Sequence, residues 1–159
     1  MHVEEHLRFM RLAIEQARLG MTNNEGGPFG AVVVKNGQVI AAANNRVTST
    51  NDPTAHAEIV AIREACRQLG SFQLNDCILY TSCEPCPMCL GAIYWARPAQ
   101  VFFACTRRDA AAINFDDDFI YREIVMPPHE RRIPMFSLLR EEALPLFTLW
   151  REKEDKTPY

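Results

Sequence analysis

The residues best suited to chemistry in this chain are a histidine, a glutamate and a pair of cysteines. His56 and Glu58 lie two positions apart, and thirty positions after the histidine the string PCPMC carries Cys86 and Cys89. Imidazole nitrogen and thiolate sulfur are ligands that Zn²⁺ prefers in proteins. Structural zinc sites normally have four protein ligands, whereas catalytic sites have three and leave one position for water. His56, Cys86 and Cys89 therefore predict a catalytic zinc.

Glu58 supplies the second part of such a chemistry. Two thiolates balance the charge of Zn²⁺, and water bound to the metal acidifies towards neutrality and yields hydroxide. A carboxylate that is close to this water but does not bind the metal is suited to moving protons. Glu58, two residues from the ligand histidine, is predicted to be the catalytic residue with this role.

The positions of the ligands predict two helix N-termini that face one another across the metal. Residues at i and i+3 lie on the same side of a helical turn, so Cys86 and Cys89 can point at one ion. Pro87 suits the first turn of a helix and places Cys86 at its mouth, where unpaired N–H groups and the helix dipole favour thiolate. His56 is predicted to lie in the first turn of its own helix, with Asp52 and Thr54 as candidate caps.

Strands and helices alternate around these ligands. Asn36-Gly37 is typical of a tight hairpin turn. The predicted elements are a helix over 4–19, strands over 31–35 and 38–44, a helix ending near 69, a strand over 77–82, a helix ending near 96, a strand over 99–105, short helices near 117–125 and 143–152, and an extended piece over 134–139. This alternation predicts a layered α/β fold with helices on both faces of the sheet.

Length and composition restrict the remaining possibilities. The 159 residues fit one domain of ordinary size, and no apolar run is long enough to span a bilayer. The net charge of −3, with 14 Arg and 3 Lys, argues against binding to long nucleic acid. The N-terminus lacks the apolar stretch of a secretory signal, so the expected location is the cytoplasm. Six cysteines in a reducing compartment are expected to be ligands or packed thiols rather than disulfides.

Two other interpretations of the cysteine motif stay open from the residues alone. A Cys-x-x-Cys pair can be a thioredoxin-like redox motif, although this explains neither His56 nor Glu58. The same residues can belong to a structural zinc site with Cys83 as a fourth ligand.

The combined pattern H-x-E followed by P-C-x-x-C is the signature of zinc-dependent base deaminases. In longer strings the chain resembles the cytidine deaminase superfamily and, within it, the bacterial guanine deaminases. The strings that carry this resemblance are GGPFGAV (26–32), NDPTAHAE (51–58), LYTSCEPCPMCLGAIYWARP (79–98) and FDDDFIYREI (115–124), together with the terminal Tyr159.

The resemblance implies hydrolysis of guanine to xanthine and ammonia. A zinc-bound hydroxide attacks C2, and Glu58 relays the proton to the ring and the leaving amine. By position, Asn45 hydrogen-bonds the purine, Phe29 stacks on it, and Asp117 recognises or protonates its amino edge. From the residues alone, each has a second, less favoured interpretation: Asn45 as a turn residue, Phe29 as a core residue, and Asp117 as one of three solvated acids at a helix start.

The resemblance also implies an architecture and an assembly. The expected fold is a three-layer α/β/α arrangement with a mixed five-stranded sheet, and residues 1–159 form a single deaminase domain with one Zn²⁺ per subunit. The expected assembly is a homodimer in which the segment from about 140 to 159 is exchanged and Tyr159 contacts the substrate of the partner. Composition alone predicts a frayed tail instead.

Rival functions share the metal site. The strings NDPTAHAEI and P-C-x-M-C-x-G-A also resemble tRNA adenosine deaminases, which need basic surface around the pocket to bind an RNA loop. The acidic segment 105–119 argues against this alternative. A cytosine or cytidine deaminase and an inactive binding subunit are further alternatives, and the intact ligands and Glu58 favour an active enzyme.

Overall fold

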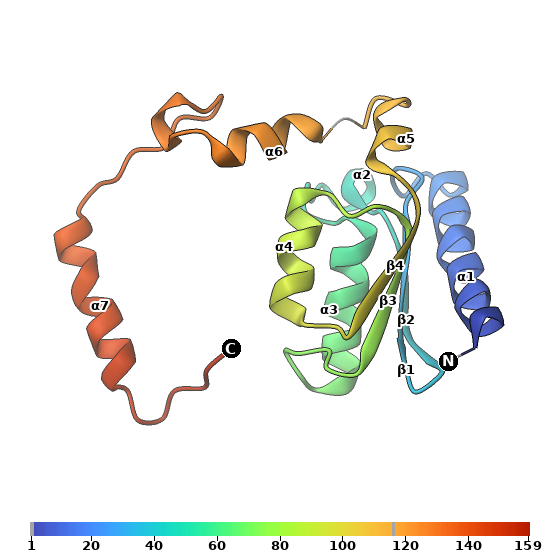
Figure 1. Ribbon diagram of the computed structural model, residues 1–159, viewed down its shortest axis with the longest axis horizontal. Helices are drawn as coiled ribbons and strands as arrows, with labels where there is room; N and C mark the ends of the chain where they lie inside the picture. The colour runs from blue at the N-terminus through green and yellow to red at the C-terminus, as the bar shows by residue number, and fades with distance from the viewer. Residues whose placement is uncertain (1, 116) are drawn as a thin grey trace. The chain divides into compact units, whose positions relative to one another are not determined.

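A mixed four-stranded sheet is the centre of the computed structural model, which describes residues 2–115 and 117–159 (Figure 1). Asp116, one of the three adjacent acids, lies outside the described residues. The strand order is β2-β1-β3-β4, with β1 at Gly30–Lys35, β2 at Gln38–Asn44, β3 at Cys77–Cys83 and β4 at Gln100–Cys105. Strand β1 pairs antiparallel with β2 and β3, whereas β3 and β4 are parallel.

The hairpin of β1 and β2 forms as predicted. Asn36 and Gly37 join the strands with positive φ angles of 51° and 75°. These angles are those of the turn that matches the natural twist of two strands, and asparagine and glycine tolerate them best. The turn leads β2 back along β1 to its last residue, Asn44, which pairs with Gly30.

Helices cover both faces of the sheet and give the predicted three layers (Figure 1). Helix α1 (Val3–Thr22) packs Phe9 and Ala13 against one face, where Tyr80 is fully buried. Helices α3 (Ala57–Leu69) and α4 (Pro87–Ala96) pack on the other face through small residues. Side chains alternate across each strand, so the apolar strands β1 and β3 contribute to both cores.

The expected fifth strand is absent from the sheet, and this prediction is wrong. Residues 134–139 are irregular, and no residue after Cys105 in the described part of the chain is in a strand. A strand exists only when a neighbour accepts and donates its backbone hydrogen bonds, and Pro134 lacks the N–H donor. An extended pattern without such a neighbour remains a loop.

The chain divides into two compact units, Met1–Asp118 and Phe119–Tyr159. The first also contains the short helices α2 (Val47–Thr50) and α5 (Arg107–Ala111), which the sequence pattern did not predict. The C-terminal part consists of α6 (Asp118–Val125), a 3₁₀ turn at Pro128–Glu130 and α7 (Arg140–Glu152). In the described part of the chain, the helices are too short or too polar to cross a bilayer.

Candidate active site

His56 lies at the N-terminus of α3, as the residue that precedes the helix rather than within its first turn as predicted. The helix begins at Ala57, and His56 is its N-cap residue, with extended backbone angles. Asp52 does not cap a helix. Its Oδ1 accepts hydrogen bonds from the backbone N and the hydroxyl of Thr54, at 2.8 and 2.7 Å. This local turn provides a hydrogen-bond acceptor for the backbone N–H of Thr54 before the helix starts. His56 is therefore the N-cap residue and not a residue of the helix itself.

The cysteine pair occupies the start of α4 as the sequence predicts. Cys86 is the N-cap residue, Pro87 is the first helical residue, and the backbone N–H of Cys89 points at the Cys86 sulfur at 3.5 Å. An N-cap side chain that accepts from the first turn satisfies one of the unpaired helix donors. The same donors stabilise a negative sulfur at this position.

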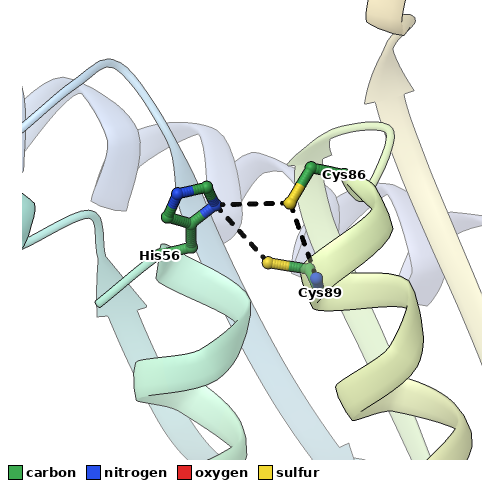
Figure 2. Close-up of side chains that lie close together, drawn as sticks. All are labelled: His56, Cys86 and Cys89. Atoms are coloured by element: carbon green, nitrogen blue, oxygen red, sulfur yellow. Dashed lines mark hydrogen bonds between the residues drawn. The ribbon is translucent and has the colours of Figure 1, made fainter. Parts of the chain in front are cut away.

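The three side chains converge from two helix ends (Figure 2). Nδ1 of His56 is 3.5 Å from Sγ of Cys86 and 3.6 Å from Sγ of Cys89. With Zn–N and Zn–S bonds of about 2.1 and 2.3 Å, a tetrahedral ion places its N and S ligands about 3.6 Å apart. The measured distances agree with this geometry, so the site fits zinc.

A fourth protein ligand is missing from the cluster. Among the described residues, the histidine, cysteine and acidic groups close enough to share an ion with one another are His56, Cys86 and Cys89. The spare Cys83 is a packed thiol: burial raises its pKa to about 12, and its sulfur donates to the carbonyl of Thr106 at 3.6 Å. The structural-site interpretation therefore loses its candidate fourth ligand.

The electrostatics of the cluster favour a metal. The hydrogen bond with Cys89 lowers the pKa of Cys86 to about 4, with a further contribution from His56, and the same bond raises the pKa of Cys89. Cys86 is therefore the thiolate of the pair. A bound metal cation deprotonates a coordinating thiol outright, so both sulfurs become anionic ligands when zinc is present.

Glu58 is a buried carboxyl group beside the cluster. Only 6% of the residue is exposed, and it lies in the first turn of α3. Burial raises the pKa of Glu58, and a hydrogen bond from the residue's own backbone N–H opposes this in part. A carboxyl group whose pKa moves towards neutrality is suited to both accept and return a proton.

Asn45 and Phe29, two predicted substrate residues, are held together by the backbone. Asn45 donates its N–H to the carbonyl of Phe29 at 2.9 Å, and only 5% of Asn45 is exposed. The next residue along, Arg46, donates its N–H to the carbonyl of Ala55, which precedes His56. The Asn45 segment is thereby connected to the start of the metal-binding helix.

Phe115 contacts the predicted substrate residue Phe29, and the sequence pattern did not single it out. Its ring meets that of Phe29 edge to face, with centroids 4.9 Å apart and planes at 89°. Gly27 lies under both rings: a Cβ there would be 3.0 Å from Phe115 and 3.1 Å from Phe29. An aromatic residue two positions before the predicted Asp117 was the available signal, but only the fold brings it to Phe29.

The last two predicted substrate residues belong to different units, Asp117 to the first and Tyr159 to the second. The pKa of His56 is raised chiefly by its hydrogen bond to Cys86, and the negative charge of Asp117 adds to this effect, so Asp117 is near enough to influence the site. Tyr159 belongs to the second unit and is 70% exposed. Its contact with a substrate stays a prediction.

Three converging ligand groups next to a buried carboxyl group fit a catalytic zinc site better than a structural one. The chain belongs to the cytidine and deoxycytidylate deaminase family, because residues 3–105 match the zinc-binding region of these enzymes.

Similarity to one relative extends over nearly the whole chain. The chain is 56% identical to the guanine deaminase of Bacillus subtilis (strain 168) over 154 residues, which are 97% of this chain and 99% of that one. The X-ray structure of the Bacillus subtilis guanine deaminase superposes with a TM-score of 0.94 at 55% identity and covers 100% of this chain and 99% of that one. The match includes the region after residue 105.

Two other relatives match a shorter stretch. The tRNA-specific adenosine deaminase of Aquifex aeolicus (strain VF5) is 43% identical over 96 residues, 60% of this chain and 63% of that one. A structure of guanine deaminase from Nitrosomonas europaea superposes with a TM-score of 0.66 at 36% identity, over 69% of this chain and 63% of that one.

Proposed function

We propose that this chain hydrolyses guanine to xanthine and ammonia in a zinc-dependent reaction. The observation that carries this proposal is the 56% identity to a guanine deaminase, which covers 97% of this chain and 99% of that one. Similarity of that extent includes the segments outside the metal cluster, where a substrate pocket acquires its selectivity. The geometry supplies the chemical requirement, a three-ligand zinc site beside a buried carboxyl group.

Deamination exchanges the 2-amino group of guanine for an oxygen atom from water, and it needs one group that both takes and gives protons. When bound, zinc acidifies water so that a nucleophile is available near neutral pH. The Glu58 carboxylate accepts one proton from the attacking water and passes it to a ring nitrogen. It then takes the second proton from the new hydroxyl group on C2 and passes it to the amine, which leaves as ammonia while the C=O bond forms. Its burial limits exchange of that proton with bulk solvent.

Asn45 is proposed to bind the purine as a hydrogen-bond donor. Its Oδ1 accepts hydrogen bonds from the backbone N–H of Gly27 at 3.3 Å and of Val47 at 3.1 Å. The side-chain oxygen is thereby engaged by the protein, and Nδ2 is the atom left for the ligand. Guanine offers acceptors at O6 and at its ring nitrogens, so a fixed donor suits it.

Phe29 and Asp117 complete the proposed contacts within the first unit. Phe29 is proposed to stack on the purine, and its ring is supported by the edge-to-face contact with Phe115. The Asp117 side chain is proposed either to recognise the amino edge of the base as a carboxylate or to protonate it as a carboxylic acid. Its electrostatic influence on His56 supports a position close to the reaction.

The second candidate function is tRNA adenosine deamination, which the local motifs also resemble. The Aquifex aeolicus relative matches 60% of this chain, whereas the guanine deaminase match extends through the C-terminal part. A net charge of −3 also gives little attraction for an RNA phosphate backbone. The longer match and the charge therefore favour a small-molecule purine.

A substrate panel tests the two functions directly. Zinc-loaded protein is incubated separately with guanine, adenine, cytosine, cytidine and tRNA, and released ammonia is measured. We expect release from guanine at least ~100-fold faster than from the other compounds, because a site that hydrogen-bonds specific groups rejects analogues that leave them unpaired. Release from tRNA alone selects the second candidate, and no release from any compound points to an inactive binding subunit.

We further propose that the protein is a homodimer in which the C-terminal segment is exchanged. Helix α7 has no buried residue, although it carries large apolar side chains that are 45–74% exposed (Leu146, Phe147, Leu149 and Trp150). An apolar helix face of this kind is normally covered by another surface. A second copy of the chain is the proposed cover, and Tyr159 then reaches the pocket of that copy.

Deleting Tyr159 is expected to lower kcat/KM for guanine by roughly tenfold, the effect of losing one hydrogen bond to a substrate. The dimer is expected to persist, because the apolar face of α7 is intact in the truncated chain. Steady-state kinetics and sedimentation measure the two properties, and Thr157→Ala is the control next to the deleted residue. Unchanged kinetics after the deletion would remove Tyr159 from the site.

A cytoplasmic location is part of the same proposal. The six cysteines are all free thiols in the structure, and two of them belong to the metal cluster. Free thiols in this number are typical of a reducing compartment.

A further inference from the structure

The partly buried Glu25 and the buried Asn44 form a polar pair directly beside Asn45. Asn44 is the last residue of β2 and is only 4% exposed. Its Nδ2 donates a hydrogen bond to the Glu25 carboxylate and also lies 3.4 Å from the carbonyl oxygen of Asn45. The carboxylate therefore fixes the residue that precedes the proposed substrate contact in the chain.

Glu25 also fixes the loop on the other side of Asn45. Its backbone N–H donates to the carbonyl of Gly20 at 2.9 Å, which ties it to the end of α1. Its carbonyl accepts from the N–H of Ser49 at 3.2 Å and from the hydroxyl of Thr48 at 3.3 Å, both in α2. One residue thus connects α1, the end of β2 and α2 around Asn45.

Helix α1 lies close to Asn44 because Gly20, at the contact, has no side chain. A Cβ at Gly20 would lie 2.1 Å from Nδ2 of Asn44, which is a severe overlap. A glycine inside a helix is less favourable than alanine. Here it allows α1 to pack directly on the buried amide.

The orientation of the Asn45 side chain depends on the two segments that Glu25 connects. Oδ1 of Asn45 accepts from Gly27, two residues after Glu25, and from Val47, at the start of α2. Within the described residues, no hydrogen bond of Nδ2 to the protein is formed. The two backbone N–H groups therefore hold the oxygen end of the amide, and the Nδ2 donor is available to a ligand only while both stay in place.

We propose that Glu25 is a positioning residue for substrate recognition. It holds Asn44, the Gly26-Gly27 loop and α2 in place, so that Asn45 presents only its Nδ2 donor to the purine. The inference rests on the proposed deamination of guanine. Without the carboxylate, the buried Asn44 amide loses one of its two acceptors and keeps only the long contact with the carbonyl oxygen of Asn45, which is costly for a buried donor group. The loop and the Asn45 side chain then lose their fixed orientation.

A double-mutant cycle tests the proposal. Asn45→Ala is expected to lower kcat/KM for guanine by roughly 100-fold, and Glu25→Ala by roughly tenfold, mainly through KM, since a weakened ground-state contact raises KM. In the Asn45→Ala background, Glu25→Ala is expected to have no further effect, because the two residues act through one contact. Glu25→Gln keeps an acceptor for Asn44 and is expected to stay within about threefold of the wild type, as is the control Glu15→Ala.

Nuclear magnetic resonance of the side-chain amides gives a readout that is independent of activity. The Asn45 Nδ2 resonance, assigned by its loss in Asn45→Ala, is expected at the same shift in the wild type and Glu25→Gln and displaced in Glu25→Ala. Glu25→Asp, with a shortened side chain, replaces Glu25→Ala in both tests if the alanine variant does not fold.

Additive losses in the cycle, or an Asn45 resonance that is unmoved in Glu25→Ala, overturn the positioning role. A wild-type protein inactive on guanine refutes the proposed function instead, and the resonance still tests the positioning.

Discussion

Replacing Glu58 with glutamine is expected to lower kcat for guanine by roughly 10²–10⁴-fold, the usual contribution of a positioned general acid and base. Glutamine has nearly the same shape and keeps a hydrogen-bond acceptor, but it cannot take up and return a proton. The residue is only 6% exposed, so bulk water has little access to replace it as a proton carrier. KM is expected to change little, because the loss falls on the reaction step rather than on binding.

Metal content separates this effect from damage to the site. Glu58 is not among the three converging ligand groups, so Glu58→Gln is expected to keep one zinc per chain by elemental analysis. Glu64→Gln is the matched control, because Glu64 is in the same helix and forms a surface ion pair with Arg67. A kcat within tenfold of the wild type in Glu58→Gln would rule out the carboxyl group as the main proton carrier.

Replacing Cys86 with alanine is expected to remove the zinc and to reduce activity at least ~1000-fold. Cys86 is the thiolate of the pair, with a pKa lowered to about 4, and it lies within 3.5 Å of the His56 nitrogen. Two remaining ligands leave the positive charge of the ion poorly compensated and its geometry unfixed. Without the ion, water keeps its ordinary weak acidity and the nucleophile is lost at neutral pH.

A control variant and the restoration of zinc test whether the loss of activity in Cys86→Ala comes from loss of the metal. Cys105→Ala removes an exposed thiol outside the cluster and is expected to keep both zinc and activity. A chelator is expected to inactivate the wild-type protein, and added Zn²⁺ is expected to restore it, whereas Cys86→Ala stays inactive at the same zinc concentration. Full activity in chelated protein, verified as metal-free by elemental analysis, would refute the metal mechanism.

The metal ligands could be predicted from the sequence because their arrangement is local. Cys86 and Cys89 are one helical turn apart, and Pro87 marks the helix start between them, so spacing alone places both sulfurs on one side. The hairpin at Asn36-Gly37 was equally local, because its φ angles follow from the residue types. The layered α/β class followed from the alternation of strands and helices along the chain.

Two predictions failed, one because of a competing local turn and one because of a distant segment. The start of α3 was placed too early, because the turn at Asp52 and Thr54 competes with the helix for the same backbone groups. The sheet has four strands rather than five, because a strand needs a neighbour that no single-chain pattern specifies.

What only the tertiary structure decided is how the residues around the ligands face one another. Periodicity gives no distance between Phe29 and Phe115, or between Glu25 and Asn44, which are 86 and 19 positions apart. The orientation of Asn45 likewise depends on two backbone N–H groups from separate segments. The sequence by itself determined which metal-binding groups are present and on which helix ends they lie. Packing determined their mutual distances and the direction of each polar side chain, because these depend on contacts between elements far apart in the chain.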